Sequence, residues 1–296
     1  MPKVCVKHID AFSSIPGKGN PAGVVLNGGD YTDEQMLAIA AAVGFNETSF
    51  VVSSNIADFR IRYFTPGHEM NLCGHATMGT VYALRMNGLL KQSDFTIETN
   101  AGVLPIHIHE ENNQLLITMQ QAKPQFQTFN GSKSEIAASI GLTEEDLHSQ
   151  YPIVYGSTGI WTLIVPVKEL ASFHNMDPAT KDFPGILKEM RRASVHPISF
   201  EVRDEGNDMH ARHFSSPFSG TVEDAVTGTA SGVMGAYYKT FVNEDMSLPT
   251  TFIVEQGHEM EKDGRVYVHV NGEHGNLEIS ISGTAVYVKD IEVEIE

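Results

Sequence analysis

Residues 62–84 read "RYFTPGHEMNLCGHATMGTVYAL", and residues 212–238 repeat the pattern as "RHFSSPFSGTVEDAVTGTASGVMGAYY". Both segments begin with Arg, an aromatic residue and Phe, pass through Thr or Ser, Pro and an acidic residue, and reach Gly-x-Ala-[Thr/Ser]. Residues 73–77 align with residues 227–231, and the second segment has four extra residues between its Arg and this point. The same order of strand, loop and helix in each half indicates an internal duplication.

Each repeat places a glycine, Gly74 or Gly228, at the start of a predicted helix. The first backbone N–H groups of a helix lack intrahelical partners, and with the positive end of the helix dipole they form an anion site. Two ordinary helix starts capped by the Thr and Ser side chains are the simpler interpretation. Two related copies in one chain favour a shared site for a carboxylate or a developing enolate.

The composition is that of a soluble globular protein with one large or two ordinary domains. The 296 residues are 41% hydrophobic and 19% charged, and the net charge of −17 would repel a nucleic acid. No apolar run approaches the roughly 18 to 20 residues of a membrane span, and the N-terminus lacks a signal-peptide pattern. Cys5 and Cys73 give no disulfide framework. We therefore expect a cytoplasmic protein with neither a nucleic-acid nor a membrane partner.

Hydrophobic periodicity predicts strands and helices in both halves, and hence an α+β fold. Thr32 and Gln35 form a capping-box signature for a helix that ends at Gly44. The other predicted helices lie at 74–87, near 133–141, from Asp177 and Pro178 onward, and at 229–241. The predicted strands lie at 4–9, 48–53, 58–64, 94–99, 103–109, 114–120, 152–157, 161–167, 196–203 and 210–214, with four more between 250 and 295.

Residues 120–133 are polar and Gln-rich, which makes them the best candidate for a linker. The predicted domains are therefore residues 1–120 and 131–284, with the active site in the cleft between them. The C-terminal strand, at about 285–296, can return to the first domain. It alternates Ile291, Val293 and Ile295 with acidic residues, so it needs a sheet to pack on.

His68, Cys73 and His75 could be zinc ligands or part of a thiol site. Across a turn into a helix, however, we expect Cys73 and His75 to point in diverging directions, and no fourth ligand lies nearby. A thiol at a helix start has a lowered pKa and can act as a base. A racemase with two thiols is excluded, because Thr227 occupies the position equivalent to Cys73. We therefore expect no metal.

Two carboxylates are candidates for acid–base chemistry. Glu47 lies between a predicted helix end and an apolar strand, where partial desolvation would bring a carboxyl group into the range that proton transfer requires. Asp224 stands three residues before the second helix start. From the residues alone, an exposed turn carboxylate for Glu47 and an Asx-turn or N-cap for Asp224 are the simpler interpretations.

Four segments in order resemble the PhzF-type isomerase family of phenazine biosynthesis. They read "DAFSSIPGKGNPAGVVL" (10–26), "FNETSFVV" (45–52), "RYFTPGHEMNLCGHATMGT" (62–80) and "VEDAVTGTASGVMGAYY" (222–238). The resemblance continues to "VEQG" near residue 257 and so covers most of the chain. The family is similar to diaminopimelate epimerase and proline racemase.

The resemblance implies two duplicated domains, each a mostly antiparallel, curled sheet or barrel around a central helix. It also implies a homodimer, no cofactor, and a small carboxylate-bearing substrate on which a proton is moved. The residues that match the family's site are, for catalysis, Glu47, His75 and Asp224 and, for substrate binding, Gly74, Gly228, Thr229 and Asn20.

The chain departs from the family pattern in two places. Ala225 and Thr229 replace a proline and a serine, and the usual Gly-Arg-Pro after Met260 is missing. The leading hypothesis is thus a cofactor-independent isomerase whose Glu47 shuttles a proton. An amino-acid epimerase and a non-catalytic small-molecule binder are the alternatives.

Overall fold

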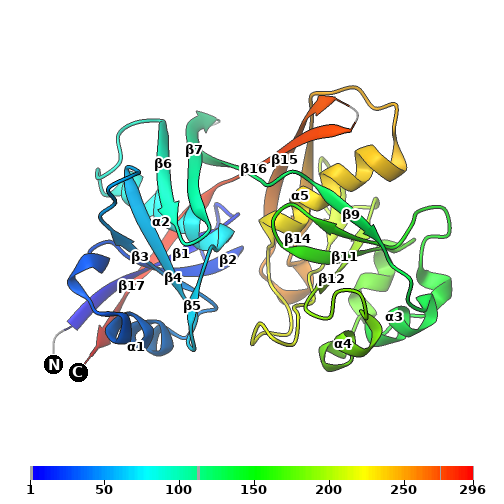
Figure 1. The fold of residues 1–296 in the computed structure, drawn as a ribbon, viewed down its shortest axis with the longest axis horizontal. Helices are drawn as coiled ribbons and strands as arrows, with labels where there is room; N and C mark the ends of the chain where they lie inside the picture. Colours follow the sequence, from blue (N-terminus) through cyan, green and yellow to red (C-terminus); the bar gives the residue numbers. More distant parts are fainter. Residues whose placement is uncertain (1–2, 112–113, 274, 296) are drawn as a thin grey trace. The chain divides into compact units, whose positions relative to one another are not determined.

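The computed structural model describes residues 3–111, 114–273 and 275–295. The chain is a mixed α/β protein with a large content of β-sheet and divides into two compact units (Figure 1). Unit 1 comprises residues 1–120 and 282–296, and unit 2 comprises residues 121–281.

Unit 1 is built on nine strands and two helices within the described residues. The helices are α1, Asp33–Val43, and α2, Gly74–Met86. The strands are β1 (Lys3–Ala11), β2 (Asn20–Val25), β3 (Thr48–Val52), β4 (Phe59–Phe64), β5 (Glu69–Met70), β6 (Asp94–Thr99), β7 (Gly102–Glu111), β8 (Gln114–Gln120) and β17 (Ala285–Glu294).

The strands of unit 1 pair in the order β17, β1, β2, β3, β4, β6, β7 and β8, with β5 also on β4. Two of these pairs are parallel, β2 with β3 and β4 with β6, and each is bridged in sequence by a helix. The others are antiparallel, including β17 with β1. The C-terminal strand therefore completes the sheet that the N-terminus begins.

Helix α1 begins and ends where the sequence predicts. The Thr32 side chain accepts from the Gln35 backbone N–H and the Gln35 side chain accepts from the Thr32 backbone N–H, which confirms the capping box. Gly44 ends the helix in the left-handed conformation, with φ of 72°. Met36, Ile39 and Ala40 pack with Val4, Val6, Phe50 and Val293 in the core of unit 1.

Helix α2 is enclosed by the sheet of unit 1 and packs against β1, β2, β3, β8 and β17. Every residue from His75 to Leu84 except Tyr82 is buried. Gly79 lies where an added Cβ would come within 3.4 Å of Ile9 and Ala22, so this helix face fits closely against β1 and β2. Such an enclosed helix leaves only its ends for contact with a ligand.

Unit 2 contains three further α-helices: α3 (Lys133–Ser139), α4 (Phe183–Ile186) and α5 (Gly228–Tyr237), the last continued by a π-helical turn, Tyr238–Val242. Its strands are β9 (Gln125–Thr128), β10 (Val154–Ser157), β11 (Trp161–Pro166), β12 (Ser194–Ser199), β13 (Met209–Ala211), β14 (Thr250–Gln256) and β15 (Gly264–Glu273). Strand β16, Asn276–Gly283, leads the chain back into unit 1.

Strand pairing in unit 2 follows the pattern of unit 1. The pair β11–β12 is parallel, β12–β13 antiparallel, β13–β14 parallel and β14–β15 antiparallel. This is the alternation of β2–β3, β3–β4, β4–β6 and β6–β7. Helix α5 connects β13 to β14 as α2 connects β4 to β6, and nine of its residues are buried.

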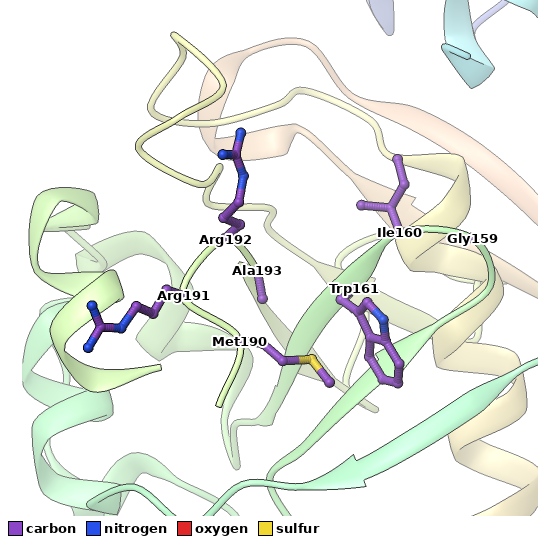
Figure 2. Close-up of a pocket in the computed structure, with 7 residues that line it drawn as sticks. All are labelled: Gly159, Ile160, Trp161, Met190, Arg191, Arg192 and Ala193. Carbon is purple, nitrogen blue, oxygen red and sulfur yellow. The ribbon is translucent and has the colours of Figure 1, made fainter. Parts of the chain in front are cut away.

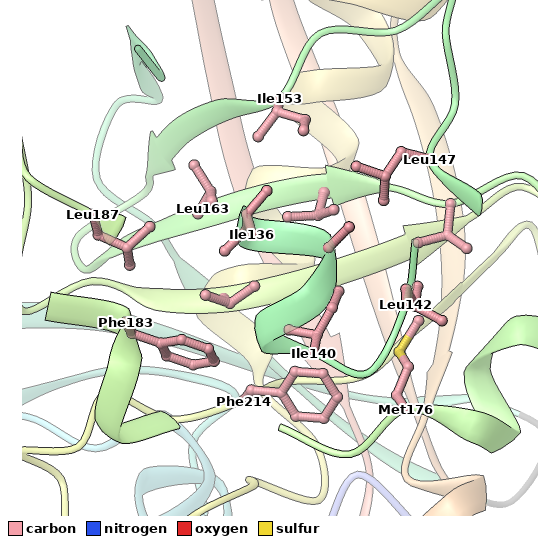
Figure 3. Close-up of a cluster of buried hydrophobic side chains, with 14 of the residues drawn as sticks. Ile136, Ile140, Leu142, Leu147, Ile153, Leu163, Met176, Phe183, Leu187 and Phe214 are labelled. Carbon is pink, nitrogen blue, oxygen red and sulfur yellow. The ribbon is translucent and has the colours of Figure 1, made fainter. Parts of the chain in front are cut away.

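An apolar cluster of unit 2 lies between α3, α4 and the sheet (Figure 3). Ile136 of α3 lies near Leu163 of β11, whereas Ile140, just after α3, lies beside Phe214 at the lower edge of the cluster in the figure, with Phe183 to its left. All five side chains are fully buried. The short helices of unit 2 are thus held by packing rather than by their own length.

The prediction of a linker at residues 120–133 is correct only in part, because the chain passes from unit 1 to unit 2 at residues 120–121 but does not stay irregular beyond residue 124. Residues 125–128 form β9, which pairs antiparallel with β10. Phe126 anchors this strand, because its ring packs edge-on against Tyr237 and Phe241. Gln125 and Gln127, two of the glutamines that suggested a linker, are exposed on this edge strand, where polar residues are expected.

The prediction of a helix starting at Asp177 and Pro178 is wrong. The backbone N–H groups of Asp177 and Ala179 donate to the carbonyls of Ile140 and Ser139 at the end of α3. These contacts with the end of α3 hold the segment at Pro178 in a non-helical conformation despite the local proline signal. The helical turns come later, at Thr180–Asp182 and Phe183–Ile186. The strands predicted at 196–203 and 210–214 end earlier, at Ser199 and Ala211.

None of the helices in the described ranges is both long and apolar enough to cross a membrane.

Replacing Leu163 with Ala should lower the free energy of unfolding by about 2–5 kcal/mol, because it opens a cavity in the unit 2 core. Leu163 is fully buried, whereas Leu89 is 55% exposed. The matched Leu89→Ala variant should therefore change stability by less than about 0.5 kcal/mol. Urea unfolding followed by circular dichroism measures both, and equal effects would contradict this assignment of the core.

Candidate functional site

Helices α2 and α5 begin in the same way. Cys73 and Thr227 are their N-cap residues, both in extended conformation and neither with a side-chain cap. The Thr77 hydroxyl donates to the Cys73 carbonyl at 2.7 Å, and the Ser231 hydroxyl donates to the Thr227 carbonyl at 3.0 Å. The interpretation in which Thr and Ser cap these helices is therefore wrong. Their hydroxyls leave the first amides of each helix available to an anion.

Three of the predicted site residues meet at the start of α2. Glu47, just before β3, places Oε2 3.1 Å from Nε2 of His75. The Asn20 amide, at the start of β2, lies 3.2 Å from Nδ1 of the same ring. The side chains of His75 and Glu47 are 8% and 14% exposed, and Asn20 is buried. The backbone also holds Glu47, whose carbonyl accepts from the Gly23 N–H at 3.2 Å.

The charge state of His75 follows from these neighbours. Burial lowers its pKa, but the adjoining Cys73 and Glu47 outweigh this effect, so the pKa lies well above that of a free histidine. The Asn20 side-chain amide can pair with Nδ1 of either the neutral or the protonated imidazole, because its NH₂ group donates a hydrogen bond and its oxygen accepts one. Nε2–H can thus donate toward Glu47, which makes a carboxylate–imidazole pair suited to holding and returning a proton.

Cys73 belongs to the same cluster, which corrects the expectation that its side chain diverges from His75. Its Sγ lies 3.4 Å from Nδ1 and 3.8 Å from Nε2 of His75. The extended backbone of Cys73, with φ of −139°, turns the sulfur over the imidazole. Burial, and then the charge of Glu47, raise the pKa of Cys73, while the adjoining His75 lowers it.

Glu47, Cys73 and His75 are also a donor set of the kind that zinc takes, with one ligand atom from each within 4.8 Å of the others. The sulfur lies 3.8 Å from Nε2, the nitrogen that faces Glu47. These separations are compatible with three ligands of one zinc ion as well as with a hydrogen-bonded cluster that holds a proton.

Asp224 lies at the start of α5 in unit 2. Its Oδ2 accepts from the Thr227 hydroxyl at 2.6 Å. Gln256 completes this turn: its Oε1 accepts from the Thr227 backbone N–H at 3.1 Å, and its Nε2 donates to the Asp224 carbonyl at 2.8 Å. Sequence reasoning missed Gln256, although it lies in the "VEQG" segment that carries the end of the family resemblance.

Gly228 and Thr229 form the first turn of α5. Gly228 is buried, Thr229 is half-buried, and the Thr229 carbonyl accepts from the Thr158 hydroxyl at 2.9 Å. Of the predicted site residues, Asn20, Glu47, Gly74 and His75 therefore cluster in unit 1. Asp224, Gly228 and Thr229 cluster in unit 2.

The segments before the two helices share a further set of contacts. The Nε and Nη2 of Arg62 donate to the two carboxylate oxygens of Glu69, both at 2.8 Å. Arg212 binds Glu223 in the same two-pronged way, at 2.8 and 2.7 Å. Each guanidinium also lies over the ring of the Phe two residues on, at 5.1 Å and 4.8 Å. The alignment of these two segments thus holds for side-chain contacts as well as for sequence.

Asp204, Glu255 and His258 form a second possible donor set for a metal, in unit 2. The Arg265 guanidinium already pairs with Asp204, and Glu255 accepts from the Arg203 and Asp204 backbone N–H groups and from His210. The Arg265 guanidinium and these hydrogen-bond donors therefore already stabilise the carboxylates of Asp204 and Glu255. The cluster ties the loop after β12 to β14.

A hollow of about 490 Å³ on unit 2 lies apart from these residues (Figure 2). Met190 points toward Trp161 across it, whereas the guanidinium groups of Arg191 and Arg192 point away. None of the predicted site residues lines this hollow.

Comparison with known proteins places these observations in a family. A profile of the phenazine biosynthesis-like proteins matches residues 9–290. An uncharacterized isomerase of Bacillus subtilis is 52% identical, over 95% of this chain and 96% of that protein. The trans-2,3-dihydro-3-hydroxyanthranilate isomerase of Pseudomonas aeruginosa is 29% identical, over 94% of this chain and 95% of that protein.

Solved structures agree with this match. A PhzF-family phenazine biosynthesis protein of Bacillus anthracis has a TM-score of 0.97 and 56% identity, with complete coverage of both chains. A probable proline racemase of Agrobacterium radiobacter has a TM-score of 0.64 at 11% identity, covering 99% of this chain and 93% of that one. The second likeness concerns the fold alone.

The raised pKa of His75 predicts a pH-dependent stability. Because the folded protein binds this proton more tightly than the unfolded chain does, the contribution is fully present below the unfolded pKa of about 6.5. It is lost as pH rises through the folded pKa. The stability deficit of His75→Asn should therefore be largest at pH 5.5 and shrink toward pH 9.5 in urea unfolding. The exposed His174→Asn should show no such trend, and a deficit that grows with pH would refute the assignment.

The two thiols should differ in reactivity, because Cys5 is exposed and Cys73 is buried. A disulfide reagent should label one thiol per native chain and two in guanidinium. In Cys5→Ser, the native protein should label at none and the unfolded chain at one. Rapid labelling of Cys73 in native Cys5→Ser would show that the cluster around His75 is open.

Proposed function

We propose that this chain, which belongs to the phenazine biosynthesis-like (PhzF) family and is an isomerase, moves a proton within a small carboxylate-bearing substrate by general acid–base catalysis. Glu47 is the group that removes and returns the proton. His75 and Asp224 assist it, and Asn20, Gly74, Gly228 and Thr229 bind the substrate.

The observation that carries this proposal is the 3.1 Å contact between Glu47 and His75 at the uncapped start of α2. A carboxylate that takes a proton from carbon needs a fixed orientation and a partner that follows its change of charge. His75 supplies both, because its Nε2–H can donate to the carboxylate and its ring is held by Asn20. Isomerisation returns a proton to another atom of the substrate, so a single carboxylate that exchanges its proton with the solvent suffices.

The helix starts supply the second requirement, stabilisation of negative charge. Removing a proton next to an unsaturated carboxylate places charge on its oxygens, and pre-oriented backbone N–H groups lower the energy of that state. Both α2 and α5 start without a side-chain cap. We assign both helix starts to substrate binding, with Asp224 and Thr229 oriented by Gln256 and Thr158.

The substrate class follows from the family. A relative 29% identical is named for trans-2,3-dihydro-3-hydroxyanthranilate, a cyclic amino acid with a hydroxyl group. We propose a cyclic or amino-acid-like carboxylate for this chain. An epimerase and a non-catalytic binder are the alternatives. Since Cys5 and Cys73 are the only cysteines, a two-thiol epimerase is not available to this sequence.

The remaining assignments complete the proposal. We infer that the two units arose by duplication as curled sheets around α2 and α5, which their matched strand alternation and paired Arg–Glu contacts support. The family resemblance further suggests a homodimer that acts in the cytoplasm without a cofactor.

Replacing Glu47 with Gln should slow proton exchange at least 100-fold, within the range of about 10²–10⁴ that general acid–base groups contribute. The assay follows deuterium incorporation from D₂O into trans-2,3-dihydro-3-hydroxyanthranilate and into a set of amino acids by mass spectrometry. Glu34→Gln, an exposed change on α1, should behave as the wild type. A wild-type exchange rate in Glu47→Gln would contradict the assignment of Glu47 as the group that moves the proton. Binding without exchange would favour the non-catalytic alternative.

A further inference from the structure

A pair of histidines in unit 2, His196 on β12 and His213 after β13, lies next to the start of α5. Their Nδ1 atoms are 3.1 Å apart, and Nε2 of His196 is 3.1 Å from Sδ of Met234 on α5. His196 is fully buried and His213 is half-buried. The His213 carbonyl accepts from the Asp224 backbone N–H at 3.0 Å, so this histidine adjoins a residue assigned to the site.

These contacts determine the tautomer of each ring. A thioether sulfur only accepts hydrogen bonds, so His196 carries its proton on Nε2 and donates to Met234. In a neutral ring Nδ1 of His196 is then an acceptor, and the short Nδ1–Nδ1 contact requires His213 to donate from Nδ1. This leaves Nε2 of His213 without a proton. Burial lowers the pKa of both histidines, that of His196 more strongly, which agrees with two neutral rings.

The free nitrogen of His213 is open to a ligand. Among the residues that the structure describes, no hydrogen bond to Nε2 of His213 occurs. His213 as a whole is half-buried, so part of the residue is accessible to a small ligand. An acceptor in such a position is suited to a ligand group that carries N–H or O–H.

Unit 1 provides an internal comparison. In unit 1, β3 and β4 pair Thr48 with Phe64 and, one position on, Ser49 with Tyr63. In unit 2, Val195 pairs with Phe214 in the same way. The positions of His196 and His213 therefore correspond to those of Ser49 and Tyr63. At these equivalent positions of unit 1 both hydroxyl groups are hydrogen-bonded. The buried Tyr63 hydroxyl bonds to Thr77, and the Ser49 hydroxyl bonds to Thr80. The histidines of unit 2 replace a satisfied hydroxyl pair by a pair with one free acceptor.

From this juxtaposition we propose that His213 is a specificity-determining residue, whose Nε2 accepts a hydrogen bond from an amino or hydroxyl group of the substrate. His196 is a positioning residue that fixes the tautomer of His213. The inference rests on the proposed function, in which the start of α5 binds the substrate carboxylate. The carboxylate site at the start of α5 and the acceptor on His213 together specify an amino or hydroxy acid rather than a simple carboxylic acid.

The tautomers of His196 and His213 can be measured by NMR spectroscopy. Long-range ¹H–¹⁵N spectra of protein labelled with ¹⁵N-histidine, assigned with His213→Gln and His196→Gln, should show His213 protonated at Nδ1 and His196 at Nε2. His213 protonated at Nε2 in the free protein would overturn the proposal. This result does not depend on any substrate.

Anthranilate and benzoate test the ligand contact, because they share a ring and a carboxylate and differ by one amino group. Both should shift the backbone amides of Gly228 and Thr229, and only anthranilate should shift Nε2 of His213. If both move the amides but neither moves His213, the inference fails while the proposed function stands. If neither moves the amides, the anion site at α5 fails, and the specificity inference that depends on it falls too.

A variant adds a quantitative readout. His213→Phe should weaken anthranilate binding about tenfold, the effect of losing one hydrogen bond, and leave benzoate binding within about twofold. Equal weakening of both ligands would indicate a merely structural role and overturn the proposal. Thermal unfolding of the variant checks that it is folded.

Discussion

The burial of α2 and α5 is the constraint on which the rest of this structure depends. A helix surrounded by strands cannot leave polar groups unpaired along its length, because each would lose water without a substitute. Thr77 and Ser231 therefore bond back to the preceding turn, and unsatisfied donors remain only at the first turn. The Arg–Glu pairs hold the chain reversals that lead into these starts. Breaking such a pair, when it is buried, typically costs about 3–5 kcal/mol.

On this common frame the two units carry different chemistry. Unit 1 adds a carboxylate, an imidazole and a cysteine at the helix start, where burial and the contacts among these three side chains shift the pKa values of Cys73 and His75. Unit 2 adds an acid whose turn is held by Gln256, and a neutral histidine pair nearby. In the proposed function, divergence of the polar contents of a duplicated frame leaves the proton-moving carboxylate in unit 1 and adds Asp224 and Thr229 in unit 2.

The parts of the fold that depend on local sequence were predictable. The capping box at Thr32, the left-handed Gly44 and the glycines that lead α2 and α5 are all set by near neighbours. Parts set by distant partners were not. Phe126 makes residues 125–128 a strand by packing on residues more than a hundred positions away, and the end of α3 prevents a helix at Pro178. At the site, family likeness singled out Glu47, but its distance to His75 and the position of Cys73 depend on backbone angles that no residue pattern encodes.

The return of β17 to β1 has a consequence for synthesis of the chain. Unit 2 is one continuous segment, so it can fold as soon as residue 281 has left the ribosome. Unit 1 begins first but lacks its edge until the end, because β17 pairs with β1 along almost its whole length and also packs against α1 and α2. Until then β1 presents an unpaired strand edge, a surface that favours association with other chains. The half that carries Glu47 and His75 is therefore the last to be completed and the more dependent on protection while the chain is being made.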